Sequence, residues 1–191
     1  MLRQEFPKVR IIANQNNAGF ARANNQGINS SSSNYLLLLN SDTVVPPGTI
    51  SKLLDYMGNA PQTGAISPRL VRLDGTPQPF AYGNDPTPGY LLRRAFTALL
   101  FRKSIHNWAI DNPIEVDWVS GACLLVRRKA IDQAGMLDEQ MFMYFEDNEW
   151  CLRMRKLGWK IVYYPDVSII HIGGQSLKQN LKAQSAYYAS L

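Results

Sequence analysis

Residues 34–42 read NYLLLLNSD, and this stretch decides the fold class. An unbroken run of leucines, without the alternation of a half-exposed strand, is typical of a strand covered on both faces of a sheet. Asn40, Ser41 and Asp42 follow the leucines at once, so we expect the strand to end in a polar turn. In open α/β sheets, ligands bind in the loops that follow such strands.

The flanking sequence alternates between strand-like and helix-like patterns. VRIIAN at 9–14 is predicted to be a strand, and NAGFARANNQGI at 17–28 a helix that begins near asparagine caps. One or two strands are expected in 64–80 with a turn at Asp74–Gly75, another in 118–126, and two strand pieces in 161–172 split by Pro165. Helices are expected in 50–57 and 147–158, and a short helix or turn in 127–135. The order predicts an α/β fold with a mixed, mostly parallel sheet flanked by helices.

Composition indicates one globular domain over residues 1–191. The chain is 46% hydrophobic and 18% charged, and its two cysteines, Cys123 and Cys151, have the apolar surroundings of buried thiols. No apolar run approaches the ~20 residues that cross a bilayer, and the first residues lack the apolar centre of a secretory signal. We therefore expect a cytoplasmic protein.

A net charge of +5 favours acidic partners, such as phosphorylated small molecules, anionic lipid or nucleic acid. Nucleic acid is the weakest of these, because the basic residues form no single tract and the aromatic residues mostly sit in apolar runs. Residues 77–112 are predicted to form a loop and a basic amphipathic insertion, and residues 177–191 a polar tail. The segment 89–110 has two readings: a helix packed on the domain with solvated arginines, or a contact with the anionic inner face of the cell membrane.

Asp42 is the first candidate site residue. A carboxylate at the carboxyl edge of a sheet can bind Mg²⁺ or Mn²⁺ together with the oxygens of a diphosphate. However, Asn40, Ser41 and Asp42 are also good turn residues, with two prolines close by. The residues alone favour the turn.

The segment YFEDNEW at 144–150 is the second candidate. Acids at a helix N-terminus are favoured by the helix dipole, so Glu146, Asp147 and Glu149 could be solvated capping residues. They follow the aromatic run MFMYF, which could exclude water and raise a carboxylate pKa into the range of a general base. These two readings are equally supported.

Two weaker signals complete the set. His171 ends the apolar strand VSIIHI, where a lone histidine is more often a packed side chain than a ligand. In NQNNAGFARANNQG, the residues Asn17, Gly19 and Asn25 could help to hold a phosphate at a helix N-terminus, although the segment matches neither a dinucleotide-binding motif nor a P-loop.

Taken in order, these segments resemble the family 2 glycosyltransferases, inverting enzymes with the GT-A fold that use nucleotide sugars, and in particular their bacterial rhamnosyltransferase-like branch. Order and spacing agree from about residue 9 to residue 176. The matching text is NNAGFARANNQGI, YLLLLNSD, WVSGACLLVRRKAI, GMLDEQMFMYFEDNEWCLRMRKLGW and YYPDVSIIHIGGQS. Several blocks in the right order are far more specific than any one of them.

The resemblance implies roles for the acidic segments. NSD stands where the family has its DxD motif, so Asp42 would coordinate the metal that bridges the donor's diphosphate, and Asn40 replaces the first acid. Asp147 would be the base that deprotonates the acceptor hydroxyl, with support from Glu146. His171 falls where some relatives supply a further metal ligand.

The resemblance also implies substrate contacts and a biological setting. Gly121 and Ala122, which follow Trp118, would let donor and acceptor approach the backbone closely. The expected reaction is transfer of a sugar from a nucleotide-diphosphate sugar to a saccharide or lipid-linked acceptor, with inversion, in cell-surface polysaccharide or glycolipid synthesis.

One departure from the family pattern raises a rival hypothesis. Family members begin with a strand, a helix and a second strand that ends in an aspartate, and this chain begins after them, so a truncated GT-A sheet is expected. The rival is a non-catalytic fragment that binds a sugar nucleotide or a partner chain without transfer. The intact NSD and FED segments favour the enzyme.

Overall fold

The protein is described here from a computed structural model. The structure describes residues 2–85, 87, 89, 92, 96, 107–141 and 145–173. Most of the predicted segment 89–110 and the whole predicted tail 177–191 lie outside these residues. The helices are α1 (Leu2–Glu5), α2 (Phe20–Asn29), α3 (Thr49–Asn59), α5 (Arg128–Ala134) and α6 (Glu146–Lys156). The strands are β1 (Tyr35–Leu39), β2 (Thr43–Val44), β3 (Thr63–Val71), β4 (Tyr82–Gly83), β5 (Ile114–Val116), β6 (Trp118–Val119), β7 (Cys123–Arg127) and β8 (Lys160–His171).

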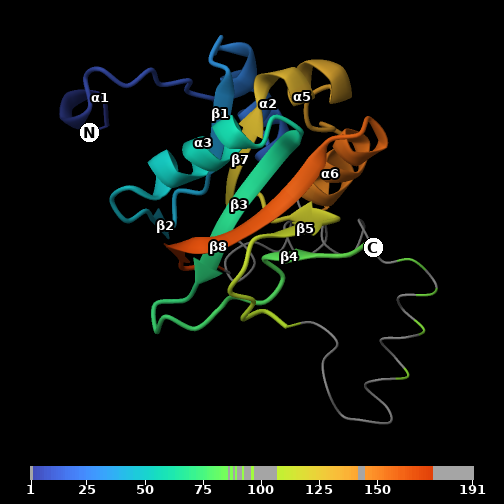
Figure 1. The fold of residues 1–191 in the computed structure, drawn as a ribbon. Helices are drawn as coiled ribbons and strands as arrows, with labels where there is room; N and C mark the ends of the chain where they lie inside the picture. The colour runs from blue at the N-terminus through green and yellow to red at the C-terminus, as the bar shows by residue number, and fades with distance from the viewer. Residues whose placement is uncertain are drawn as a thin grey trace.

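One mixed sheet forms the centre of the molecule. Its strands lie in the order β1-β7-β3-β8-β2, and β5 also pairs with β8. A separate two-stranded sheet joins β4 to β6. Figure 1 shows the long strands β3 and β8 side by side across the middle of the molecule.

Helices cover both faces of the sheet (Figure 1). The expectation that the whole leucine run is buried is wrong, because β1 lies at the edge of the described sheet and Leu39 is 43% exposed. On one face, Leu53 and Met57 of α3 pack against Ile66, Leu125 and Val162 of the strands. On the other face, a larger core contains buried residues of α2, α5 and α6: Ala21, Ile28, Ala130, Ile131, Trp150, Cys151 and Met154. The alternation within β7, where Leu124 and Val126 face one cluster and Leu125 the other, fixes the strand between two helical layers.

The mixed sheet flanked by helices is confirmed, but the expectation of a mostly parallel sheet is wrong. Among the described strands, only β3 and β8 are parallel neighbours, because β7 runs antiparallel to both β1 and β3. An apolar run indicates that a strand packs against a core and does not encode the direction of its neighbours, so the leucine pattern could not give that direction.

Two further strand predictions need correction. Residues 9–14 form no strand, and Val9 and Ile12 are 59% and 44% exposed. In the described part of the chain no strand lies beside them, and β-rich composition alone does not order an isolated strand. The segment 118–126 is two strands, β6 and β7, that belong to different sheets and are separated by a turn at Gly121–Ala122.

Pro165 does not split the last strand. β8 runs without a break from Lys160 to His171, and the proline falls where the parallel register with β3 shifts between Pro68 and Arg69. A proline is tolerated at such an irregularity because the ladder makes no demand on its missing N–H. The described residues include no helix long and apolar enough to span a membrane.

Candidate active site

The turns after β1 and before β7 lie side by side. The two strands are antiparallel, with Leu39 opposite Cys123, so the carboxyl end of β1 meets the amino end of β7. The backbone N–H of Asn40 donates to the carbonyl of Ala122 at 3.0 Å and continues the ladder one step beyond the strands. This bond joins the segment of Asp42 to the segment of Gly121.

His171 is the partner of Asp42. β2 and β8 pair with Thr43 opposite His171, and this register brings Nε2 of His171 to 3.4 Å from Oδ1 of Asp42. The second carboxylate oxygen, Oδ2, accepts from the backbone N–H of Gly173 at 3.2 Å. The imidazole is 11% exposed and the carboxylate 27%, so both side chains lie at a partly covered edge of the sheet. Asp42 is a turn residue, as its neighbours predict, and its carboxylate also faces the histidine.

The pair fits a divalent cation as part of its ligand set. Two ligands on adjacent octahedral positions, at bonds of about 2.1 Å, lie about 3 Å apart. The 3.4 Å between Nε2 and Oδ1 is close to that separation. Within the described part of the chain, no group of three or more His, Cys, Asp or Glu side chains is placed to hold a metal, so the pair would be only part of the ligand set.

Asp147 contacts the turn at Gly121–Ala122, which precedes β7. Its Oδ2 accepts from the N–H of Gly121 at 2.9 Å, and its Oδ1 accepts from the N–H of Asn148 at 2.9 Å. Burial raises the pKa of this carboxyl above its usual range, and the two backbone bonds oppose the rise because they stabilise the charged form. The position at the start of α6 and the raised pKa both suit a general base.

Glu146 is not a solvated capping residue. It is 6% exposed, and its Oε2 has no hydrogen-bond partner among the described residues. Burial, followed by the nearby charge of Asp147, raises the pKa of Glu146 to about 7. Phe145, just before it, has φ of 66°, a conformation that bulky residues rarely adopt. Residues 142–144 of the predicted aromatic run lie outside the described residues.

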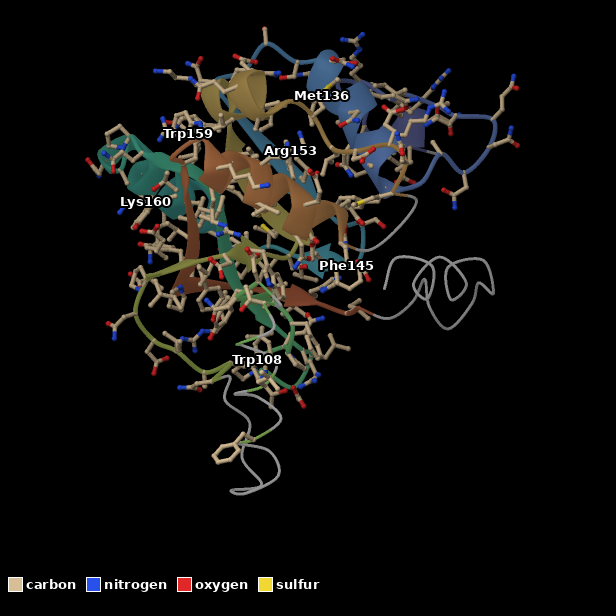
Figure 2. The ribbon with its side chains drawn as sticks, turned by 90° about the vertical axis from the view of Figure 1, so that its right-hand side faces the viewer. Trp108, Met136, Phe145, Arg153, Trp159 and Lys160 are labelled. Atoms are coloured by element: carbon tan, nitrogen blue, oxygen red, sulfur yellow. The ribbon has the colours of Figure 1, made fainter. Side chains whose placement is uncertain are left out.

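Hydrogen bonds and an ion pair hold α6, the helix that carries these acids, in place. Figure 2 shows Phe145 at one end of the helix, with Trp159 and Lys160 beyond its other end. Arg153 bonds both carboxylate oxygens of Glu149, at 2.6 and 2.8 Å, and donates to the carbonyl of Met136 at 2.7 Å. Glu149 is therefore an ion-pair partner in the helix scaffold.

The structure places Gly121 against side chains of the protein itself. A Cβ added at this position would lie 2.9 Å from the ring of Phe20 and 3.7 Å from Oδ2 of Asp147. The close approach at Gly121 is thus made by Phe20 and Asp147. Ala122 is 4% exposed and belongs to the core. Trp118 is partly exposed, and its Nε1 donates to the carbonyl of Asn84 at 3.2 Å.

In the predicted phosphate-holding segment, the side chains of Asn17 and Asn25 form hydrogen bonds within the protein. Oδ1 of Asn17 accepts from the N–H of Gly19 at 2.9 Å, a local turn at the start of α2. Asn25 is 3% exposed; its amide donates to the carbonyl of Leu137 at 2.9 Å, and its oxygen accepts from the N–H of the same residue at 3.1 Å. Both hydrogen bonds hold the loop before α6, so the Asn25 side chain has a structural role.

Sequence reasoning missed three residues that the structure brings to the site. Phe20 packs beside Gly121, Asn148 bonds Asp147, and Oε1 of Gln78 lies 3.0 Å from Nδ1 of His171. Phe20 and Asn148 belong to sequence segments that were already candidates for the site. Gln78 lies in a proline-rich loop, where no sequence motif indicates a role, and the fold places it next to His171.

Comparison with known proteins identifies the family. The sequence profile described as "Glycosyltransferase like family 2" matches residues 1–189. The chain belongs to this family. The family 2 domain is also similar to two curated rhamnosyltransferases. It is 33% identical, over 88% of its length, to the N-acetylglucosaminyl-diphospho-decaprenol L-rhamnosyltransferase of Mycobacterium tuberculosis, and covers 60% of that protein. It is 26% identical, over 91% of its length, to the dTDP-rhamnosyl transferase RfbF of Shigella flexneri, and covers 56% of it.

Solved structures give the fold of the family 2 domain. It superposes on GalNAc-T7 bound to UDP, GalNAc and Mn²⁺ with a TM-score of 0.62 and 14% identity, over 89% of this chain and 33% of the other. It superposes on the mannosyltransferase PcManGT of Pyrobaculum calidifontis, bound to GDP-Man and Mn²⁺, with a TM-score of 0.57 and 14% identity, over 91% of this chain and 42% of the other. The domain has a GT-A-like fold, as the resemblance implied.

Proposed function

We propose that this family 2 domain transfers a sugar from a nucleotide-diphosphate sugar to an acceptor hydroxyl, with inversion at the anomeric carbon. One observation carries the proposal: the Asp42–His171 pair and the Asp147 carboxylate flank a single turn, linked through the Asn40–Ala122 and Gly121–Asp147 bonds. Transfer requires one acidic site for the diphosphate and a separate base for the acceptor. The two sites are built on strands and a helix start, which suits rigid positioning.

The reaction assigns each group a task. Asp147 takes the proton of the acceptor hydroxyl as the acceptor oxygen bonds the anomeric carbon, and the bond from that carbon to the diphosphate oxygen breaks. The bonds from Gly121 and Asn148 fix the orientation of the base, and its raised pKa makes it a better proton acceptor than an exposed aspartate. Asp42 and His171 would hold a Mg²⁺ or Mn²⁺ ion, which when bound neutralises charge on the departing diphosphate.

The relatives' names support a proposal for the donor and the acceptor. Two relatives are named as rhamnosyltransferases, one of them as using dTDP-rhamnose and the other as acting on a diphospho-decaprenol. We therefore propose a dTDP-sugar donor first, with UDP- and GDP-sugars next, and a lipid-linked saccharide acceptor in cell-wall or O-antigen synthesis. Contact with the anionic inner face of the membrane through 89–110 belongs to the same proposal.

Calorimetric titration of dTDP, UDP and GDP, each with and without Mn²⁺, tests the donor site. We expect at least one nucleotide to bind in a Mn²⁺-dependent manner and Asp42→Asn to weaken that binding. Asp147→Asn is the matched variant, because it makes the same aspartate-to-asparagine replacement at the other acidic site. It should keep nucleotide binding and lower transfer by about 10²–10⁴-fold, the usual contribution of a general base.

Two results would overturn this proposal. Failure of every nucleotide to bind in the presence of Mn²⁺ would disprove the proposed donor site. Wild-type transfer rates in Asp147→Asn would disprove the role of Asp147 as the base. Nucleotide binding without transfer to any lipid-linked acceptor would support the rival hypothesis of a binding module.

A further inference from the structure

Gln78 sits behind the Asp42–His171 pair and has no role in the reaction described above. Its backbone N–H donates to the carbonyl of Leu70 at 2.8 Å, and Pro77 beside it forms a bridge with Val71. The glutamine is thus held against the end of β3, and its side chain is partly buried. From this position its Oε1 lies 3.0 Å from Nδ1 of His171.

The contact selects a tautomer of the imidazole. A carbonyl oxygen only accepts, so Nδ1 of His171 must carry the proton of the neutral ring. The lone pair of the ring then lies on Nε2, which faces Oδ1 of Asp42 and Nδ2 of Asn40, each at 3.4 Å. In this tautomer the Asn40 amide donates to Nε2, and a cation bound between Nε2 and Oδ1 of Asp42 would replace that contact.

Gly173 makes room for this arrangement. A Cβ at position 173 would lie 3.1 Å from Nε2 of Gln78, and the backbone N–H of the glycine donates to Oδ2 of Asp42 at 3.2 Å. Gly173 therefore leaves space for the Gln78 side chain and orients the Asp42 carboxylate. The chain on both sides of His171 is held by these bonds and by the pairing of β2 with β8.

We propose that Gln78 is a positioning residue that holds His171 in the Nδ1–H tautomer, so that Nε2 and the Asp42 carboxylate together form a divalent-cation site. The proposal rests on the donor site of the proposed function and assigns a residue to it. Among the described residues, loss of the acceptor at position 78 would leave Asp42 as the acceptor that faces the ring, which favours a proton on Nε2 and blocks that atom as a ligand.

Three variants separate this role from a structural one. Gln78→Met keeps the length of the side chain and removes the acceptor, whereas Gln78→Glu keeps an acceptor oxygen. Gln26→Met is the control, because the Gln26 side chain on α2 forms solvent-exposed hydrogen bonds with Asn14, which precedes the helix. The chain has two histidines, so a His171→Gln spectrum identifies the ring signals of His171.

The first readout is the tautomer in the metal-free protein, from ring ¹⁵N chemical shifts at pH 8.5, where an ordinary imidazole is neutral. We expect Nδ1–H in the wild type, Gln78→Glu and Gln26→Met, and a shift toward Nε2–H in Gln78→Met. The second readout is binding of Mn²⁺ alone, from the electron paramagnetic resonance of free Mn²⁺. Gln78→Met should lose about 10–100-fold in affinity, the usual effect of removing the partner of a metal-binding histidine.

The outcomes are distinguishable. An Nδ1–H tautomer that persists in Gln78→Met would overturn the role of Gln78, as would unchanged Mn²⁺ affinity in that variant. A wild type that shows the Nδ1–H tautomer but binds no Mn²⁺ would overturn the proposed metal site and leave the tautomer assignment standing. If Gln78→Met does not fold, an Nε2–H tautomer in Gln78→Glu, which keeps an acceptor oxygen, would overturn the role of Gln78.

Discussion

The backbone N–H of Gly121 donates to Oδ2 of Asp147 at 2.9 Å, so the turn before β7 holds the acid at the start of α6. The bond connects segments that are far apart in sequence and belong to different structural layers. It leaves no room for a side chain at position 121, because a Cβ there would lie 2.9 Å from the ring of Phe20.

Gly121→Ala should therefore destabilise the protein by about 1–3 kcal/mol, the usual cost of overpacking, and lower transfer through displacement of Asp147. Gly27→Ala is the matched control, since Gly27 lies in α2 and a Cβ there meets no atom within 4 Å. Alanine is the better helix former, so this variant should gain about 0.5–1 kcal/mol. Denaturant unfolding of both variants measures the difference, and equal stability would contradict the crowding at Gly121.

Glu146 should make stability depend on pH. Its pKa is about 7 in the folded protein and 4.5 when unperturbed, so the folded state keeps a proton that the unfolded state releases. Stability therefore falls as pH rises between these values, by about 3 kcal/mol for the whole shift. Glu146→Gln should match the wild type near pH 4 and be more stable at pH 8. Urea unfolding at both pH values measures this, and parallel pH profiles of the two proteins would disprove it.

Arg155 should be important for stability because it joins α6 to two other segments. It contacts Oδ1 of Asp117 at 3.0 Å and the carboxylate of Asp85, and these side chains are 22–31% exposed. Arg155→Met would leave two neighbouring carboxylates unpaired and should cost about 2 kcal/mol. The control is Lys160→Met, whose partner Glu115 is 58% exposed and should contribute at most about 1 kcal/mol. Thermal unfolding compares them, and equal losses would contradict a special role of Arg155.

The two thiols should be unreactive in the folded protein. Cys123 and Cys151 are 0% and 1% exposed, and burial raises the pKa of each to about 12. Thiolate is the reactive form, so iodoacetamide at pH 8 should modify neither residue until urea unfolds the chain. Mass spectrometry of the native and unfolded samples counts the adducts. Rapid labelling of either cysteine in the native protein would show that it is accessible.

Local patterns predicted most of the elements, because each depends on residues close in sequence. The leucine run gave β1, and the spacing of Leu53 and Met57 gave the buried face of α3. Strand direction and the loss of a strand at 9–14 were not predictable in this way, because both depend on which strand lies alongside.

Local sequence patterns placed the acids at the ends of elements: Asp42 after an apolar strand, and Glu146 and Asp147 at the start of a helix. Which residues these acids contact depends on the fold. The β2–β8 register brings His171 to Asp42, the end of β3 brings Gln78 to His171, and the turn at Gly121 reaches Asp147. The burial of Glu146 also depends on the tertiary structure. These contacts join residues distant in the chain, and their energies arise from packing and desolvation that no local pattern encodes.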